Sequence, residues 1–255
     1  MVQQLIPITS DTEYDLNYPE SDGKPMADNT IQFRWIVTLK ENLEILFAAI
    51  ADVFVAGDLL WYPVEKNKKC QAPDVMVVFG IQKGDRRSYK QWEENNIAPQ
   101  VVFEILSSSN TTKEMANKLL FYQRYGVEEY YIYDPETVDL TGLLRSGEDL
   151  EVIEEMNGWV SPRLGVRFEL TPDKLEIYRP DGQKFLTFVE LDQLRDQEHQ
   201  RAEQESQRAE QESQRAEQER QQKEAALSQL QEEQQRYQDL LARLQERGID
   251  LEQLQ

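Results

Sequence analysis

The sequence predicts a mixed α/β domain of the α+β type, with a small antiparallel β appendage and a long C-terminal helix. Three observations predict it. Within the first 190 residues, segments of helical periodicity alternate with short β-branched runs that end at Gly or Pro. Beyond them a seven-residue pattern repeats, which is typical of one long helix. The hydrophobic fraction of 39% is low for one packed globule of 255 residues and agrees with two unlike parts.

We divide the chain into an N-terminal extension at 1–25, a folded domain at 26–190 and a helical region at 191–255. The core of the folded domain is expected to run in the order α-β-β-β-α-β. Its first helix is expected from about Asn29 to Phe47, with Asp28 or Asn29 as the N-cap. The core elements that follow are expected at Val53–Tyr62, Val75–Phe79, Val101–Leu106, about Lys113–Tyr125, and Tyr130–Tyr133.

Short strands joined by Gly and Pro turns predict the antiparallel appendage. They are expected at Thr141–Arg145, Glu151–Glu155, Gly158–Pro162 and Leu175–Arg179. A further strand at Val166–Leu170 is expected to end the core.

The C-terminal helix is expected to have one seam of small and apolar residues. This seam collects Ala202, Ser206, Ala209, Ser213, Ala216, Leu227, Leu230, Tyr237, Leu241, Leu244 and Leu251. Both positions that flank the seam in the repeats are glutamate, so two copies of that stretch repel one another and should pair weakly. The leucine-rich end from Leu227 to Leu254 is therefore the expected oligomerisation zone, with a second copy or a partner helix, although Gln234 and Gly248 interrupt it.

The formal charge of −20 opposes a general nucleic-acid-binding surface, because affinity for phosphates comes mainly from Lys and Arg. Residues 195–255 hold 15 acidic and 9 basic residues, so the acidity is not confined to the tail. A local basic cluster consists of Lys66, Lys68, Lys69, Lys83, Arg86, Arg87 and Lys90. It is interpreted equally as electrostatic support for an anionic substrate or as a solvated loop.

Cys70 is the only cysteine, which excludes an internal disulfide and a cysteine-based zinc site. His199 is the only histidine and is expected on a solvated helix, so mechanisms that need a His pair are excluded. We expect Cys70 to be an inert thiol. The chain opens without a basic, apolar leader and has no apolar run of roughly 20 residues, so a cytoplasmic protein without membrane contact is expected.

Two carboxylates stand at the polar edges of apolar runs. Asp74 precedes Val-Met-Val-Val-Phe, and Glu104 interrupts Val-Val-Phe-Glu-Ile-Leu. A carboxylate on a buried strand is unfavourable unless it is paired or holds a cation. Carboxylates from two neighbouring strands are hard oxygen ligands that leave positions open for water and substrate. The sequence therefore predicts that Asp74 and Glu104 share a Mg²⁺ or Mn²⁺ ion that polarises a phosphate.

Lys118 is expected to face inward, because a step of about 100° per residue puts it on the same side of its helix as Met115. A cation there can assist the attacking water and the charged transition state. The alternative is a surface lysine whose stem covers apolar area while its amine reaches solvent. Glu114, four residues earlier, is a candidate to pair with Lys118 and fix its position.

Other polar residues are weaker candidates. Asp58 is a possible additional ligand, but Gly57-Asp58 is also typical of a bulge or turn, which we favour. Glu44 is a further possible ligand, although an exposed helical glutamate is the favoured interpretation. The segment from Ser107 to Ser109, with Asn110, is expected to form the loop that enters and caps the second helix.

The ordered set of Pro73-Asp74, Glu104-Ile-Leu-Ser107, Lys118 with Phe121-Tyr122, Gly126-Val-Glu-Glu-Tyr130 and Asp134-Pro135 resembles the Uma-type restriction endonucleases. The resemblance covers roughly 25–180 and implies a restriction-endonuclease-like core of the PD-(D/E)xK nuclease superfamily. In the usual pattern of that superfamily a lysine follows the second acid by two residues, but here that position is Leu106. The resemblance implies that the lysine has moved to the following helix, as Lys118.

The resemblance implies Mg²⁺-dependent hydrolysis of DNA, with Asp74 and Glu104 as metal ligands and Lys118 as the residue that orients or activates the water. The alternative from a different class is a scaffold of nuclease fold that acts through its C-terminal coiled coil, which would account for the acidity of the chain.

Overall fold

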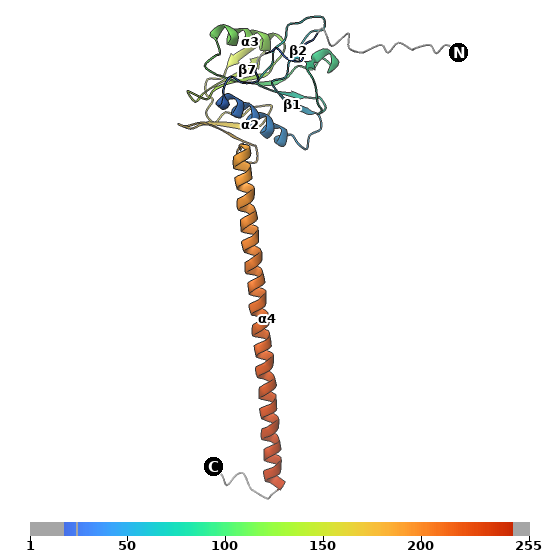
Figure 1. Cartoon of the computed structure of the whole chain (residues 1–255), viewed down its shortest axis with the longest axis vertical. Helices are drawn as coiled ribbons and strands as arrows, with labels where there is room; N and C mark the ends of the chain where they lie inside the picture. The colour runs from blue at the N-terminus through green and yellow to red at the C-terminus, as the bar shows by residue number, and fades with distance from the viewer. Residues whose placement is uncertain (1–17, 24, 247–255) are drawn as a thin grey trace, which may run out of the picture. The chain divides into compact units, whose positions relative to one another are not determined.

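The computed structural model of the chain describes residues 18–23 and 25–246 (Figure 1). It comprises two compact units, Met1–Val189 and Glu190–Gln255. Most of the expected N-terminal extension lies outside the described residues.

Six strands in the described part of the first unit form one mixed sheet. In the order in which they lie side by side, they are β1 (Val53–Gly57), β3 (Val75–Phe79), β5 (Val101–Ile105), β6 (Glu129–Asp134), β7 (Asp139–Ser146) and β8 (Asp149–Val152). Neighbouring strands are antiparallel except β5 and β6, which are parallel. Parallel neighbours require a crossover connection, and helix α3 (Thr112–Arg124) supplies it.

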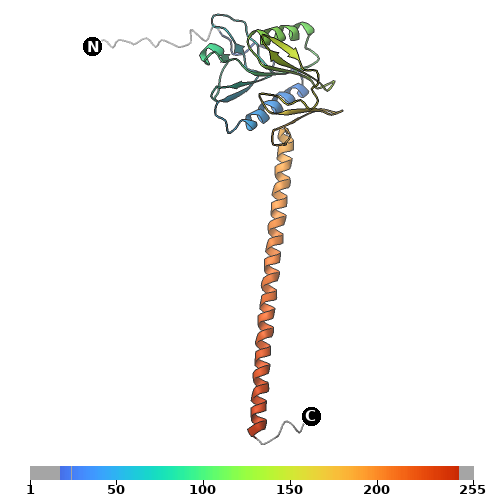
Figure 2. The same cartoon turned by 180° about the vertical axis from the view of Figure 1, so that it is seen from behind.

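Helices α2 (Thr30–Leu46) and α3 cover opposite faces of this sheet, as Figures 1 and 2 show. Successive residues of a strand point to opposite faces, so the central strands contribute to two apolar clusters. The cluster under α2 includes Ile36 and Leu43 of that helix. The cluster under α3 includes Phe121 and Tyr122.

The expected core order α-β-β-β-α-β is confirmed, with most core elements within one residue of their expected bounds. Of the two candidate N-caps of α2, Asn29 fills the role. Its side-chain oxygen accepts hydrogen bonds from the backbone N–H groups of Ile31 and Gln32, at 3.0 and 2.8 Å.

The expectation of one strand over Val53–Tyr62 is wrong, because the chain turns at Asp58. This residue has a φ of 48°, in the left-handed region, and its backbone N–H donates to the carbonyl oxygens of Pro73 and Asp74. The turn agrees with the favoured interpretation of Gly57-Asp58. After it come short elements outside the main sheet, namely β2 (Trp61–Tyr62), which pairs in parallel with β4 (Tyr89–Lys90), and the 3-10 helix η1 (Gln91–Glu93).

The appendage is smaller than expected, because β7 and β8 continue the main sheet. Only β9 (Arg167–Leu170) and β10 (Leu175–Tyr178) form a separate antiparallel sheet among the described residues. The expected strand Gly158–Pro162 is reduced to a single bridge between Val160 and Arg167. Gly158 has a φ of +81°, and the backbone turns back at Ser161, so this segment does not extend as a strand.

The second unit contains nearly all of the helix α4 (Phe188–Glu246), which confirms the expected long helix. Figures 1 and 2 show it without a break. None of the side chains described on it is buried, and His199 is exposed there as expected. The last seam residues, beyond Glu246, lie outside the described residues. Among the helices described, none is long and apolar enough to cross a bilayer.

Candidate functional site

Asp74 and Glu104 meet across the boundary between β3 and β5. The two strands are antiparallel, and Val75 pairs with Phe103. Asp74, which precedes Val75, therefore lies opposite Glu104, which follows Phe103. Directly opposite residues of an antiparallel pair have Cβ atoms about 4.5–5.5 Å apart. Their alternate neighbours belong to the cluster under α3, so both acids lie on that face.

Asp74 is largely buried, and its Oδ2 accepts a hydrogen bond of 2.6 Å from the backbone N–H of Ile105. Burial, and next the charge of Glu104, raise the pKa of Asp74 well above the usual carboxyl value, whereas the bond from Ile105 acts in the opposite direction. Two carboxylates held this closely repel one another. The site therefore favours a cation between them.

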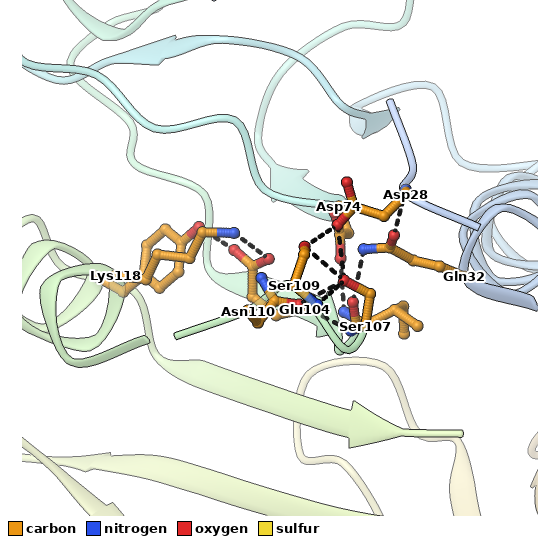
Figure 3. Close-up of polar contacts among 10 residues, drawn as sticks. Asp28, Gln32, Asp74, Glu104, Ser107, Ser109, Asn110 and Lys118 are labelled. Carbon is orange, nitrogen blue, oxygen red and sulfur yellow. Dashed lines mark hydrogen bonds and ion pairs between the residues drawn. The ribbon is translucent and has the colours of Figure 1, made fainter. Parts of the chain in front are cut away.

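Glu104 is only 1% exposed, yet both of its oxygens have donors from α3. The Lys118 ammonium lies 2.7 Å from Oε2, and the Tyr122 hydroxyl donates to Oε1 at 2.5 Å. Figure 3 shows Lys118 pointing from α3 to Glu104. Burial raises the pKa of Glu104 overall, although the charge of Lys118 and both hydrogen bonds lower it.

Lys118 faces inward, as expected, and its side chain is 13% exposed. Burial lowers the pKa of its amine, but the charge of Glu104 and the hydrogen bond to it outweigh burial, and the pKa is raised. Lys118 is therefore a cation at neutral pH and cannot act as a base in this state. Glu114 also raises the pKa of Lys118 through its charge, while the direct hydrogen bond is to Glu104.

A cavity of about 360 Å³ opens beside the acids. Its charged lining among the described residues consists of Asp22, Asp28, Asp58, Asp74, Glu114 and Lys118. The fold thus brings Asp58 and Glu114 to the same cavity as Asp74. Glu44 does not line it. The Glu44 carboxylate lies 2.9 Å from the amine of Lys40 and is 44% exposed, as the favoured interpretation of a solvated glutamate expected.

A polar network joins the start of α2 to the end of β5 on the other wall of the cavity (Figure 3). The side chain of Gln32 donates to the carbonyl oxygen of Ile105 and accepts from the backbone N–H of Asp28, each at 2.8 Å. The carboxylate of Asp28 accepts hydrogen bonds from the hydroxyls of Ser107 and Ser109. This network fixes the end of the strand that carries Glu104.

The expected cap of α3 is corrected, because Thr111 is its N-cap and accepts a hydrogen bond from the backbone N–H of Glu114. Asn110 instead accepts a hydrogen bond from the backbone N–H of Ser107 within the loop. Gln32 was not predicted to contribute. A signal was present, since Gln32 precedes Ile36 by one helical turn and is a polar member of the buried stripe of α2.

The basic cluster does not form one surface. Lys83 donates to the carbonyl oxygens of Phe47 and Ala48, and Arg86 binds Glu94 and lies over the ring of Phe54. These two cations therefore stabilise the fold. Three others are exposed in the loop after β2, namely Lys66, Lys68 and Lys69.

Cys70 follows that loop and lies near Tyr62. Burial raises the pKa of its thiol. The thiol is therefore protonated at neutral pH, in agreement with the expected inert cysteine.

The site fits a hard divalent cation of the Mg²⁺ type. Its donor atoms are carboxylate oxygens, and each carboxylate has about four lone-pair positions, of which Glu104 uses two for Lys118 and Tyr122. Mg²⁺ is commonly held by one or two protein carboxylates and keeps several waters. Among the residues that the structure describes, no three His, Cys, Asp or Glu side chains are spaced to hold a metal ion. Asp74 and Glu104 thus offer an open pair of ligands rather than a closed cage.

Asp74 and Lys118 thus line the cavity, and the buried Glu104 is bonded to Lys118. A family model described as "Putative restriction endonuclease" (Uma2) matches residues 21–173. This match spans more than half of the chain, and the chain belongs to the Uma2 family. The resemblance seen in the sequence is confirmed.

Among solved structures, the chain is similar to a putative nuclease belonging to DUF820 from Anabaena variabilis ATCC 29413. The two share 16% sequence identity, and the alignment covers 55% of this chain and 74% of that chain with a TM-score of 0.41. No curated protein matches the chain.

Proposed function

We propose that this protein is a Mg²⁺-dependent endonuclease that hydrolyses phosphodiester bonds of DNA. The observation that carries the proposal is the cross-strand pair of Asp74 and Glu104 beside a cavity, with the Lys118 ammonium bonded to Glu104. Family membership supports the same class of reaction.

In this proposal Asp74 and Glu104 hold the metal ion, and Asp58 adds negative charge to the same cavity. The chemistry that bound Mg²⁺ supplies is polarisation of the phosphate and a lower pKa of the attacking water. Lys118 supplies a second positive charge. Because its amine is protonated, it orients the water and stabilises negative charge that develops on the phosphate, and it does not remove a proton.

The exposed lysines of the loop after β2 are the proposed contacts for the DNA backbone. The loop ends close to the cavity, because Gln71 and Ala72 line it, and the Lys69 amine lies 5.9 Å from the ring centre of Phe121 on α3. Lys69 thus places positive charge near the cavity, and Lys66 and Lys68 are exposed in the same loop.

The test is plasmid nicking by the purified full chain with Mg²⁺ or Mn²⁺. The unchanged protein is expected to nick, and Asp74→Ala is expected to lower the rate at least about 100-fold, because it removes a ligand of the metal. Glu44→Ala is the matched control, since it removes an acid that lies apart from the cavity. Equal nicking by all three proteins would identify a contaminating nuclease and refute the proposal.

We also propose that α4 joins subunits or binds a partner helix through its leucine-rich end, which includes Leu227, Leu230 and Leu240, each more than half exposed. Truncation after Gln200 is expected to lower the oligomeric mass measured by light scattering and to leave the unfolding midpoint of the first unit unchanged. An unchanged number of subunits in the truncated chain would refute the assembly role.

A scaffold without catalysis is the second candidate function. The charge of −20 and five carboxylates around the cavity favour it, because both oppose the approach of a polyanion. If no protein in the nicking test cuts DNA while truncation of α4 still changes the mass, the scaffold is the better description.

A further inference from the structure

Tyr122 is the second hydrogen-bond donor to Glu104. The proposed function gives roles to Asp74, Glu104 and Lys118 but none to Tyr122. It is 0% exposed, and its hydroxyl donates to Oε1 of Glu104 at 2.5 Å. Lys118 reaches the other oxygen, Oε2, at 2.7 Å. Lys118 and Tyr122 are four residues apart on α3, so the same face of the helix presents a cation and a hydroxyl to one carboxylate.

The two donors differ in stiffness. A lysine amine stands on a flexible stem of four carbons, so it can leave its partner when another cation arrives. The ring of Tyr122 is held by aromatic neighbours, with Trp61 stacked at 6.3 Å and Tyr130 edge-on at 4.9 Å between ring centres. Its hydroxyl is therefore fixed in place by packing.

We propose that Tyr122 is a positioning residue, whose hydroxyl holds the carboxylate of Glu104 in the orientation that lets Glu104 and Asp74 share a divalent cation. This inference rests on the proposed metal-dependent function. Hydrogen bonds to a ligating carboxylate limit its rotation and are a common means of tuning metal affinity. Because Tyr122 binds Oε1, Oε2 becomes available when Lys118 moves away, and the carboxylate keeps its direction.

Tyr130 provides a matched control in the same cluster. It is also 0% exposed, and its ring contacts that of Tyr122. Its buried hydroxyl has no hydrogen-bond partner among the described residues. Tyr122→Phe and Tyr130→Phe therefore remove the same group from the same environment, and only the first removes a bond to Glu104.

The experiment measures Mn²⁺ affinity of the full chain by titration calorimetry or electron paramagnetic resonance, without DNA. Tyr122→Phe is expected to weaken Mn²⁺ binding about 10-fold, and Tyr130→Phe to leave it within about twofold. Near-ultraviolet circular dichroism of both variants without metal checks that the aromatic cluster is intact. In the nicking assay, the loss from Tyr122→Phe is expected to be largely recovered at saturating Mn²⁺, because the variant binds the ion less well but keeps Lys118.

The outcomes separate the two proposals. If the unchanged chain binds Mn²⁺ and Tyr122→Phe binds it equally well, the positioning role is refuted and the metal site stands. If both variants weaken binding alike, the hydroxyls act only through packing, and the positioning role is again refuted. If the unchanged chain binds no Mn²⁺, the metal-dependent function fails and this inference fails with it.

Discussion

Glu104 and Glu129 are two buried carboxylates on neighbouring strands, but their surroundings indicate different roles. Glu104 is 1% exposed on β5, and Glu129 is 0% exposed on β6. They lie on opposite faces of the sheet, since Glu129 shares its face with Tyr131 under α2 and Glu104 lies under α3. Burial alone therefore does not distinguish an acid proposed to bind a metal from a structural one.

The difference lies in what surrounds each group. Glu129 accepts hydrogen bonds from neutral donors, namely the hydroxyls of Tyr131 and Ser161 and the backbone N–H of Arg163. Glu104 instead has Lys118 as a direct partner and the carboxylate of Asp74 on the neighbouring strand, and both of these residues line the cavity. A buried acid that faces a like charge beside a cavity indicates a cation site, whereas one whose hydrogen bonds all come from neutral donors indicates a structural role in holding a turn.

The largest effect on stability is expected at the structural acid. Glu129→Ala leaves three donors without an acceptor, and each buried donor of this kind is worth about 1–3 kcal/mol. Because removal of a desolvated charge opposes this loss, we expect the free energy of unfolding to fall by about 3 kcal/mol in urea titrations.

The same variant tests whether the two acids are independent. Glu129→Ala is expected to bind Mn²⁺ as tightly as the unchanged chain at a urea concentration where both are folded. Weaker Mn²⁺ binding by Glu129→Ala would contradict this expectation, because it would show that Glu129 affects the geometry of the metal site.

Removal of the cation beside Glu104 is expected to have the next largest effect. Lys118→Met keeps the length of the side chain but leaves two carboxylates without their positive partner, which is expected to lower the free energy of unfolding by about 2 kcal/mol at neutral pH. Mn²⁺ replaces the lost charge, so the increase in melting temperature on adding Mn²⁺ should be larger than in the unchanged chain. DNA nicking by the variant should be lost.

A smaller rise in melting temperature on adding Mn²⁺ in Lys118→Met would contradict this account, because it would make Lys118 a support of the metal rather than its competitor. Differential scanning calorimetry at matched Mn²⁺ concentrations provides the measurement, with Lys40→Met as a control for the loss of a lysine that pairs with Glu44.

The sequence was sufficient to single out the two acids and the lysine that the structure brings together, because each breaks a local rule. Asp74 and Glu104 are charges within apolar runs, and Lys118 lies on the inward side of an amphipathic helix. These violations are visible without knowledge of strand pairing. The core order followed from the same patterns of periodicity, and the structure confirms it.

Features that depend on pairing between distant segments were not predicted. Glu128 and Glu129 are adjacent and chemically identical, yet Glu128 is at the surface beside Arg163 and Glu129 is buried. The donors that Glu129 binds at Ser161 and Arg163 lie more than 30 residues away in the sequence, so local periodicity does not identify them. Asp28 likewise looks like a helix cap, and its contact with Ser107 requires β5 and α2 to be placed side by side.

A gain in stability is expected at Asp74, the acid proposed to bind the metal, in contrast to the loss at Glu129. Asp74→Asn keeps an oxygen that accepts the bond from Ile105 and removes the repulsion with Glu104. We expect the metal-free variant to be more stable by about 1 kcal/mol at neutral pH, by urea titration, and not to bind Mn²⁺. A variant less stable than the unchanged chain would mean that the charge of Asp74 is already satisfied without metal.

The smallest expected effect is the pH dependence of that gain. Burial, and next the charge of Glu104, raise the pKa of Asp74, so Asp74 binds a proton more tightly in the folded chain than in the unfolded chain. The resulting penalty on the folded state is absent below the pKa of the unfolded chain and appears as the pH rises through the pKa of the folded chain. Asparagine does not ionise. The stability difference between Asp74→Asn and the unchanged chain should therefore grow as the pH rises above the usual carboxyl pKa of about 4, and should fall toward zero as the pH drops below that value. A stability difference that does not change with pH would show that Asp74 affects stability through packing rather than through its charge.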